Sequence, residues 1–140
     1  MSTSETTLQG TVPLIGRILI ASIFILSGLS KLAAPAATQG YIASAGLPAP
    51  LLAYIVAIVV EAGGGLLLLV GYRTRLVAAV LAVFTLVAAV AFHHALGDQN
   101  QFIHFFKNLA MAGGLLQVVA FGAGRFSLDN RVGSRTMRMA

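Results

Sequence analysis

The sequence from Ala49 to Val70 reads APLLAYIVAIVVEAGGGLLLLV and contains one charged residue, Glu61. A helix of this length rises about 33 Å at 1.5 Å per residue, which is enough to cross the hydrocarbon core of a bilayer. Hydrophobic residues make up 58% of the 140-residue chain, charged residues make up 9%, and the mean hydropathy is +0.91. This stretch therefore predicts an integral membrane protein rather than a soluble domain.

Three further apolar runs of similar length occupy residues 12–32, 76–96 and 102–121. Because backbone groups in lipid must be satisfied within the chain, each run is predicted to be a helix. The connections at 71–75 and 97–101 are short and imply antiparallel neighbours. The first connection is longer and rich in Pro and Gly, with a short interfacial turn predicted at 41–44. The chain is predicted to be a single domain over 1–140, an all-α integral membrane four-helix bundle.

The basic residues predict the orientation, because Lys and Arg gather on cytoplasmic loops. With four spans, the N-terminus, the connection at 71–75 and the tail at 124–140 share one side. That side holds Arg17, Arg73, Arg75, Arg125, Arg131, Arg135 and Arg138, whereas the other side holds Lys31 and Lys107. Both termini are therefore predicted to be cytoplasmic, with the tail near anionic headgroups. The same scatter explains the net charge of +5, so no nucleic-acid partner is predicted.

Several chemistries are excluded by composition. The chain has no cysteine, so disulfides, thiolate metal sites, iron–sulfur ligation and cysteine nucleophiles are absent. The serines of the first run have no histidine nearby in the sequence, and the glycines at 63–65 lie inside a predicted span, where they favour helix packing. No self-contained catalytic motif is present.

Glu61 is the most unusual residue, because a charge near the bilayer centre costs about 2.5 to 3.5 kcal/mol. It must be protonated, paired or in contact with water. Arg17 on the first predicted helix differs from it in depth by roughly 6 Å, a distance that arginine can span. Arg17 therefore has two main interpretations, a buried pair with Glu61 or snorkelling to the cytoplasmic surface, and a ligand contact is the third.

A second polar group is predicted at the outer end of the bundle. His104, Lys107 and Asn108 share one face of the fourth predicted helix. His93 and His94 end the third predicted helix at a similar depth, and Lys31 ends the first. Together with the charged pair, these residues predict a polar pocket. Its candidate ligand-binding residues are Arg17, Glu61, His93, His104, Lys107 and Asn108.

Histidines at this level could also bind a haem or a metal ion. His93 and His104 at matched depth suit a bis-histidine haem, but no other motif supports one, and haem is not the prediction. A metal site built from His93, His94 and His104 would have only Asp98 as a nearby carboxylate. No metal is predicted.

These residues sit within a larger pattern that resembles the DoxX family of small four-helix bacterial membrane proteins. Its strongest part is the block from His104 to Ala110, HFFKNLA, which leads into GGLL at 113–116. The other matching positions are Gly16-Arg17, Phe24, Ser27-Gly28, Lys31, Gly46-Leu47-Pro48, Glu61, Gly64-Gly65, Leu69-Val70-Gly71, Arg75, Phe92-His93 and Asp98. The resemblance implies a multi-pass protein of the bacterial cytoplasmic (inner) membrane.

The resemblance also implies a link to quinones, because the family takes its name from a subunit of quinone-reducing thiosulfate oxidation. The preferred function is a quinone-linked or oxidative-stress-related redox subunit that binds a small lipophilic ligand, with quinone as the cofactor candidate. Electrons would come from a bound cofactor or a partner. An enzymatic role would be that of a subunit of a quinone-dependent oxidoreductase.

Two alternative functions stay open. One is a non-catalytic scaffold or assembly subunit, whose polar groups lock the helices. The other is a small proton-coupled transporter with Glu61 as the titrating carboxylate, although no interrupted helix is evident in the sequence. Besides lipids, the expected partners are other copies of the chain or a membrane or redox protein.

Overall fold

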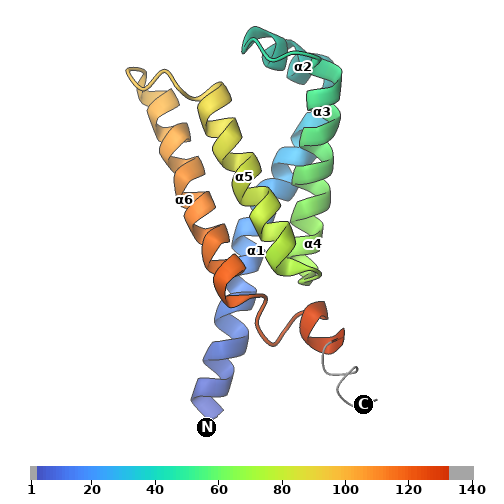
Figure 1. Cartoon of the computed structure of the whole chain (residues 1–140), viewed down its shortest axis with the longest axis vertical. Helices are drawn as coiled ribbons and strands as arrows, with labels where there is room; N and C mark the ends of the chain where they lie inside the picture. The colour runs from blue at the N-terminus through green and yellow to red at the C-terminus, as the bar shows by residue number, and fades with distance from the viewer. Residues whose placement is uncertain (1–2, 133–140) are drawn as a thin grey trace.

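The computed structural model describes residues 3–132, with side chains from residue 8 onward, and its regular structure is helical. Figure 1 shows long helices joined by short turns. The elements in chain order are α1 (Thr3–Ala33), α2 (Pro35–Ser44), α3 (Pro50–Ile58), η1 (Val59–Gly63), α4 (Gly64–Val70), α5 (Thr74–Phe92) and α6 (Gln99–Phe121).

Four helical segments are long and apolar enough to cross a membrane: Leu8–Ala33, Pro50–Val70, Thr74–Phe92 and Gln99–Phe121. The second consists of α3, η1 and α4 in succession. Large apolar side chains cover the outside of these segments, as lipid contact requires. The prediction of an all-α protein with four membrane-spanning helices is therefore confirmed.

The helices α1, α5 and α6 begin at Thr3, Thr74 and Gln99 instead of residues 12, 76 and 102, and the structure differs from the sequence-based expectation in three further places. The third span ends at Phe92 instead of residue 96, because the chain turns at 93–98 to reach the N-cap of α6. The predicted turn at 41–44 belongs to the ten-residue helix α2, which begins at Pro35, where proline suits the first helical turn. The third difference is η1, a π-helical segment inside the second span that contains Glu61.

Glycines allow α1 to approach the second span closely. A Cβ at Gly28 would lie 2.8 Å from both the Cβ and the backbone nitrogen of Ala62, and a Cβ at Gly65 would lie 2.9 Å from Ile25 Cγ1. On the other side, α5 and α6 form an antiparallel pair (Figure 1). A core of buried apolar side chains joins α1, α4, α5 and α6: Ala21, Phe24, Leu68, Val77, Ala78, Leu81, Ala82 and Leu115.

The two ends of the molecule differ. Figure 1 shows the N-terminus, the α4–α5 turn and the C-terminal segment at one end, and α2 with the α5–α6 turn at the other. The α5–α6 pair diverges from α3 toward the end that carries α2 (Figure 1). The polar residues of the spans must be considered in relation to these two ends.

The close approach of α1 to η1 predicts a stability effect. Gly28→Ala places a methyl group against the backbone of Ala62, which cannot move aside cheaply, so we expect a loss of about 1–3 kcal/mol. Thermal unfolding in detergent, followed by circular dichroism, measures it as a lower Tm. Gly63→Ala is the control, because its Cβ meets nothing within 4 Å. Equal effects of the two substitutions would contradict the close contact.

Candidate functional site

A cavity of about 640 Å³ lies among all four spans at the end of the molecule that carries α2. Most of its lining is apolar and comes from α3 and α5. Its polar lining residues come from every span and from α2: Ser27, Lys31, Thr38, Tyr41, Glu61, Thr85, His93, Lys107 and Asn108. An apolar pocket with a few convergent polar groups is the usual form of a small-molecule site.

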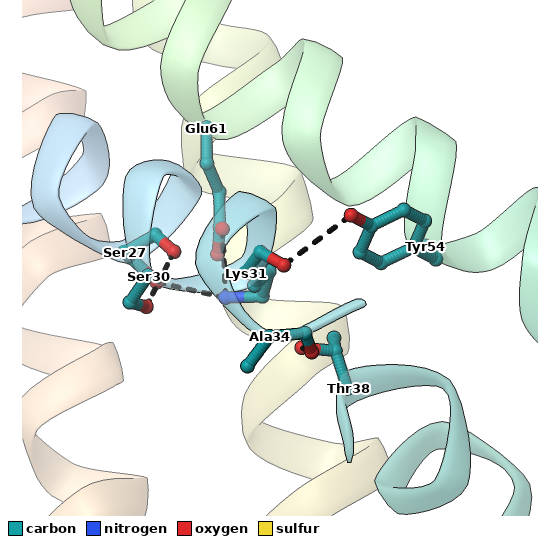
Figure 2. A network of polar contacts seen from close by, with 7 residues as sticks. All are labelled: Ser27, Ser30, Lys31, Ala34, Thr38, Tyr54 and Glu61. Atoms are coloured by element: carbon teal, nitrogen blue, oxygen red, sulfur yellow. Dashed lines mark hydrogen bonds and ion pairs between the residues drawn. The ribbon is translucent and has the colours of Figure 1, made fainter. Parts of the chain in front are cut away.

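One wall of the cavity carries an ion pair between α1 and η1. Lys31 Nζ lies 2.8 Å from Glu61 Oε2 and donates a 2.8 Å hydrogen bond to Ser27 Oγ (Figure 2). Tyr54 from α3 donates its hydroxyl to the backbone oxygen of Lys31 at 3.3 Å. Glu61 Oε2 accepts no hydrogen bond of good geometry, so charge attraction holds the pair. Glu61 is 7% exposed, and Lys31 neutralises it.

The local backbone explains why these two residues meet. Gly28 sits against Ala62, which follows Glu61, and Lys31 lies three residues after Gly28 on α1. Residues three apart share a helix face, so the contact at Gly28 brings Lys31 over Glu61. Glu61 lies at the middle of η1, and π-helical segments within α-helices frequently occur at functional sites.

The opposite wall carries histidines and a second lysine. The rings of His93 and His104 stack with centroids 5.0 Å apart, and Lys107 Nζ lies 2.9 Å from His104 Nδ1. His93 Nδ1 lies 3.2 Å from Gln101 Oε1. Burial lowers the pKa of His93, and the nearby His104 and Lys107 lower it further, against the hydrogen bond with Gln101. His93 is therefore neutral at neutral pH.

Two buried polar side chains face the cavity without a hydrogen bond among residues 3–132. They are Asn108 on α6, which is 8% exposed, and Thr85 on α5, which is 3% exposed. By contrast, the hydroxyl of Thr38, which also lines the cavity, donates to Ala34 O at 2.8 Å. The polar atoms of both side chains are accessible from the cavity rather than fully enclosed, so a ligand or water in the cavity can be their hydrogen-bond partner.

Aromatic side chains connect α2 to α5 beside the cavity. The rings of Tyr41 and Phe92 stack with centroids 5.3 Å apart, and both residues line the cavity. Through this contact α2 covers part of the cavity at the end of the spans.

Arg17 is far from this arrangement, and both main sequence-based interpretations of it are corrected. Glu61 pairs with Lys31 instead, because Lys31 is brought over it by the contact at Gly28. Arg17 does not snorkel either, since it is 1% exposed. Its Nη2 donates to the backbone oxygen of Phe126, and it attracts Asp129. Arg17 does not line the cavity.

The segment around Asp129 completes the start of α5. Its Oδ1 accepts from the backbone N–H of Arg73 at 2.7 Å and its Oδ2 from that of Thr74 at 2.8 Å. The N-cap residue of α5, Arg73, makes no capping hydrogen bond with its own side chain. Burial alone would raise the pKa of Asp129, but hydrogen bonding by the side chain and backbone of Thr74 and by the backbone of Arg73, together with the charge of Arg17, outweighs it, and the pKa lies below its usual value.

The structure thus brings four predicted residues to one cavity, Glu61, His93, Lys107 and Asn108, with His104 in contact with two of them. The candidate list lacked Lys31, which ends the first predicted helix, and Thr85. Thr85 had a detectable signal, since it is a lone hydroxyl deep in an apolar run. Among residues 3–132, no group of three His, Cys, Asp or Glu side chains is placed to hold a metal ion.

Together, the fold and the site define a multi-pass helical membrane protein with a polar-lined cavity between its spans. The profile of the DoxX family matches residues 12–94. The chain is 39% identical over 123 residues to the inner membrane protein YphA of Escherichia coli K12, covering 84% of this chain and 88% of that protein. It is 38% identical over 116 residues to the inner membrane protein YqjF of the same organism, covering 83% and 88%. No solved structure matches.

The chain therefore belongs to the DoxX family and is an inner membrane protein. The profile match ends near His94, before α6 begins, so the block from His104 to Ala110 lies outside it. The two relatives extend the similarity over more of the chain than the profile does.

The ion pair predicts strong coupling between Lys31 and Glu61. Lys31→Met leaves a buried carboxylate without its counter-charge, and we expect a loss of about 3–5 kcal/mol in the free energy of unfolding, with a similar loss for Glu61→Leu. The double variant removes both charges and should recover most of the loss. Equilibrium unfolding in mixed detergent and SDS measures all three. Additive losses in the double variant would contradict the pairing.

Because Asp129 caps α5, we expect it to slow amide hydrogen exchange at the start of that helix and to make the stability of this contact depend on pH. Asp129→Asn should speed hydrogen exchange at Arg73 and Thr74 roughly fivefold, the equivalent of about 1 kcal/mol for a lost cap. Because the folded-state pKa of Asp129 is lowered, its stabilisation is full above the ordinary carboxyl value of 3.8 and is lost as pH falls through the folded value.

Asp98→Asn is the matched control, because Asp98 caps α6 at Gln101 N and should affect only that helix. Exchange measured by mass spectrometry after correction for intrinsic rates distinguishes the two. If wild type and the Asp129 variant respond alike to acid below pH 3.8, the assignment is wrong.

Proposed function

We propose that this protein binds a small lipophilic molecule with a polar headgroup, a quinone being the best fit, as the membrane subunit of a quinone-linked or oxidative-stress-related redox system. The observation that carries the proposal is a pair of side chains without a hydrogen-bond partner, the Asn108 amide and the Thr85 hydroxyl, that face a largely apolar cavity. Carbonyl oxygens of a quinone ring would accept hydrogen bonds from both.

The size and lining of the cavity support this ligand class. Its volume of about 640 Å³ lies within the range of roughly 300–1,000 Å³ typical of small-molecule sites. Apolar residues of α3 and α5 suit a ring and the start of a hydrocarbon tail. A lipophile can reach the cavity from the membrane itself.

The protein's own contribution is binding and proton exchange. Glu61, Lys31 and Lys107 line the cavity and His104 adjoins it, so groups able to donate or accept a proton surround the ligand position. A bound cofactor or a partner protein would supply the electrons. We propose that this partner is a membrane or redox protein, or that copies of the chain associate.

We also propose that both termini are cytoplasmic. Among the residues that the structure describes, Arg73, Arg75, Arg125 and Arg131 belong to the end that carries the N-terminus (Figure 1). Arg135 and Arg138 lie outside the described residues. This arginine excess supports the cytoplasmic assignment by the positive-inside rule. The chain lacks cysteine, so single cysteines at Gln99 and Arg125, labelled from outside intact cells, test it: only the first should react.

The ligand proposal predicts the effects of two substitutions. Thr85→Val and Asn108→Leu keep the side-chain size and remove the hydrogen bond, and each should weaken binding of a neutral 1,4-naphthoquinone about tenfold, the equivalent of about 1.4 kcal/mol. Equilibrium dialysis with protein in nanodiscs, against empty nanodiscs, measures the Kd.

Thr38→Val is the matched control. It also lines the cavity, but its hydroxyl is already bonded to Ala34 O, so the Kd should not change. Unchanged Kd values in the Thr85 and Asn108 variants would remove the proposed site. If the wild-type protein binds no quinone, the scaffold function becomes the better account.

A further inference from the structure

The positive and negative charges that line the cavity do not balance. Three charged side chains line it: Lys31, Glu61 and Lys107. Lys31 and Glu61 form an ion pair and cancel each other. No carboxylate of the described residues lies within ion-pair distance of Lys107. The cavity therefore carries one uncompensated positive charge, on the wall formed by α5 and α6.

The Lys107 ammonium has more N–H groups than it has hydrogen-bond acceptors in this structure. Its Nζ lies 2.9 Å from His104 Nδ1. The Lys107 ammonium has three N–H groups, of which His104 takes one. The unpartnered amide of Asn108 is the next residue on α6, also facing the cavity.

The depth of Lys107 makes this charge hard to explain by lipid contact alone. It lies eight residues into α6, about 12 Å along the helix axis from Gln99. Its side chain lines the cavity and is also exposed on the outside of the structure, and a cation at that depth in lipid is unfavourable unless an anion or water compensates it. The imidazole that contacts Lys107 supplies no negative charge.

We propose, on the basis of the binding function above, that the ligand of this cavity is an anion: a lipophilic ring compound with an ionised oxygen, such as an acidic hydroxyquinone. The ionised oxygen contacts Lys107 and Asn108, and the ring extends toward the apolar side chains of α3. On the opposite wall the Lys31–Glu61 pair has no net charge, so the ionised end of the ligand is attracted to the α6 side.

Two ligands of nearly equal size test the proposal. They are 2-methyl-1,4-naphthoquinone, which is neutral, and 2-hydroxy-1,4-naphthoquinone, which is ionised at neutral pH. Their Kd values are measured by equilibrium dialysis with wild-type protein in phosphatidylcholine nanodiscs, with empty nanodiscs correcting for partition into lipid. The hydroxy compound should bind about tenfold more tightly, because hydrogen bonds to a charged oxygen are roughly twice as strong as neutral ones.

Substitutions of Lys107 test whether its positive charge causes the tighter binding of the hydroxy compound. Lys107→Met should remove the tenfold preference, whereas Lys107→Arg should keep it. Circular dichroism spectra and Tm establish that both variants fold, and the Arg variant keeps the test valid if the Met variant does not.

The outcomes separate this inference from the proposed function. Equal binding of the two compounds, or a preference that survives in Lys107→Met, overturns the inference and leaves quinone binding in place. If neither compound binds to the wild-type protein, the proposed function itself fails. A preference that is lost in Lys107→Met and kept in Lys107→Arg supports the anionic ligand.

Discussion

The ion pair between Lys31 and Glu61 joins the first two spans at the level where the cavity begins. An ionised carboxylate in the middle of a membrane helix is unfavourable without a counter-charge, and the close contact of α1 lets Lys31 supply one. The contact at Gly28 provides that approach, and the π-helical segment contains the carboxylate. The remaining polar groups of the site lie across the cavity from this fixed point.

The two ends of the molecule use buried charge in different ways. At the α2 end, charged side chains line a space large enough for a ligand. At the other end, Arg17 and Asp129 connect α1, the start of α5 and the C-terminal segment. Gly71 allows this connection, since its φ is +73° and any side chain there would collide with the Arg17 guanidinium. One charge cluster faces a ligand space, and the other fastens the chain.

Hydropathy and length alone were enough to predict four spans, because lipid forces long apolar runs into helices. The histidines, Lys107 and Asn108 were also recognisable, since polar residues on one helix face meet at one depth. The partner of Glu61 could not be recognised, because helical depth favoured Arg17. The true partner, Lys31, reaches Glu61 because its side chain extends inward and because Gly28 packs against Ala62. The role of Arg17 depends on Phe126 and Asp129, more than one hundred residues away in sequence, which no local pattern reveals.

The carboxylate of Asp129 has a consequence for biogenesis. During synthesis, the third span enters the membrane before residue 129 has left the ribosome, so the first amides of α5 begin without their final acceptor. Only after the fourth span has been inserted can the segment that follows it fold back and satisfy them. The contacts between Asp129 and the start of α5 therefore form after the fourth span is in place.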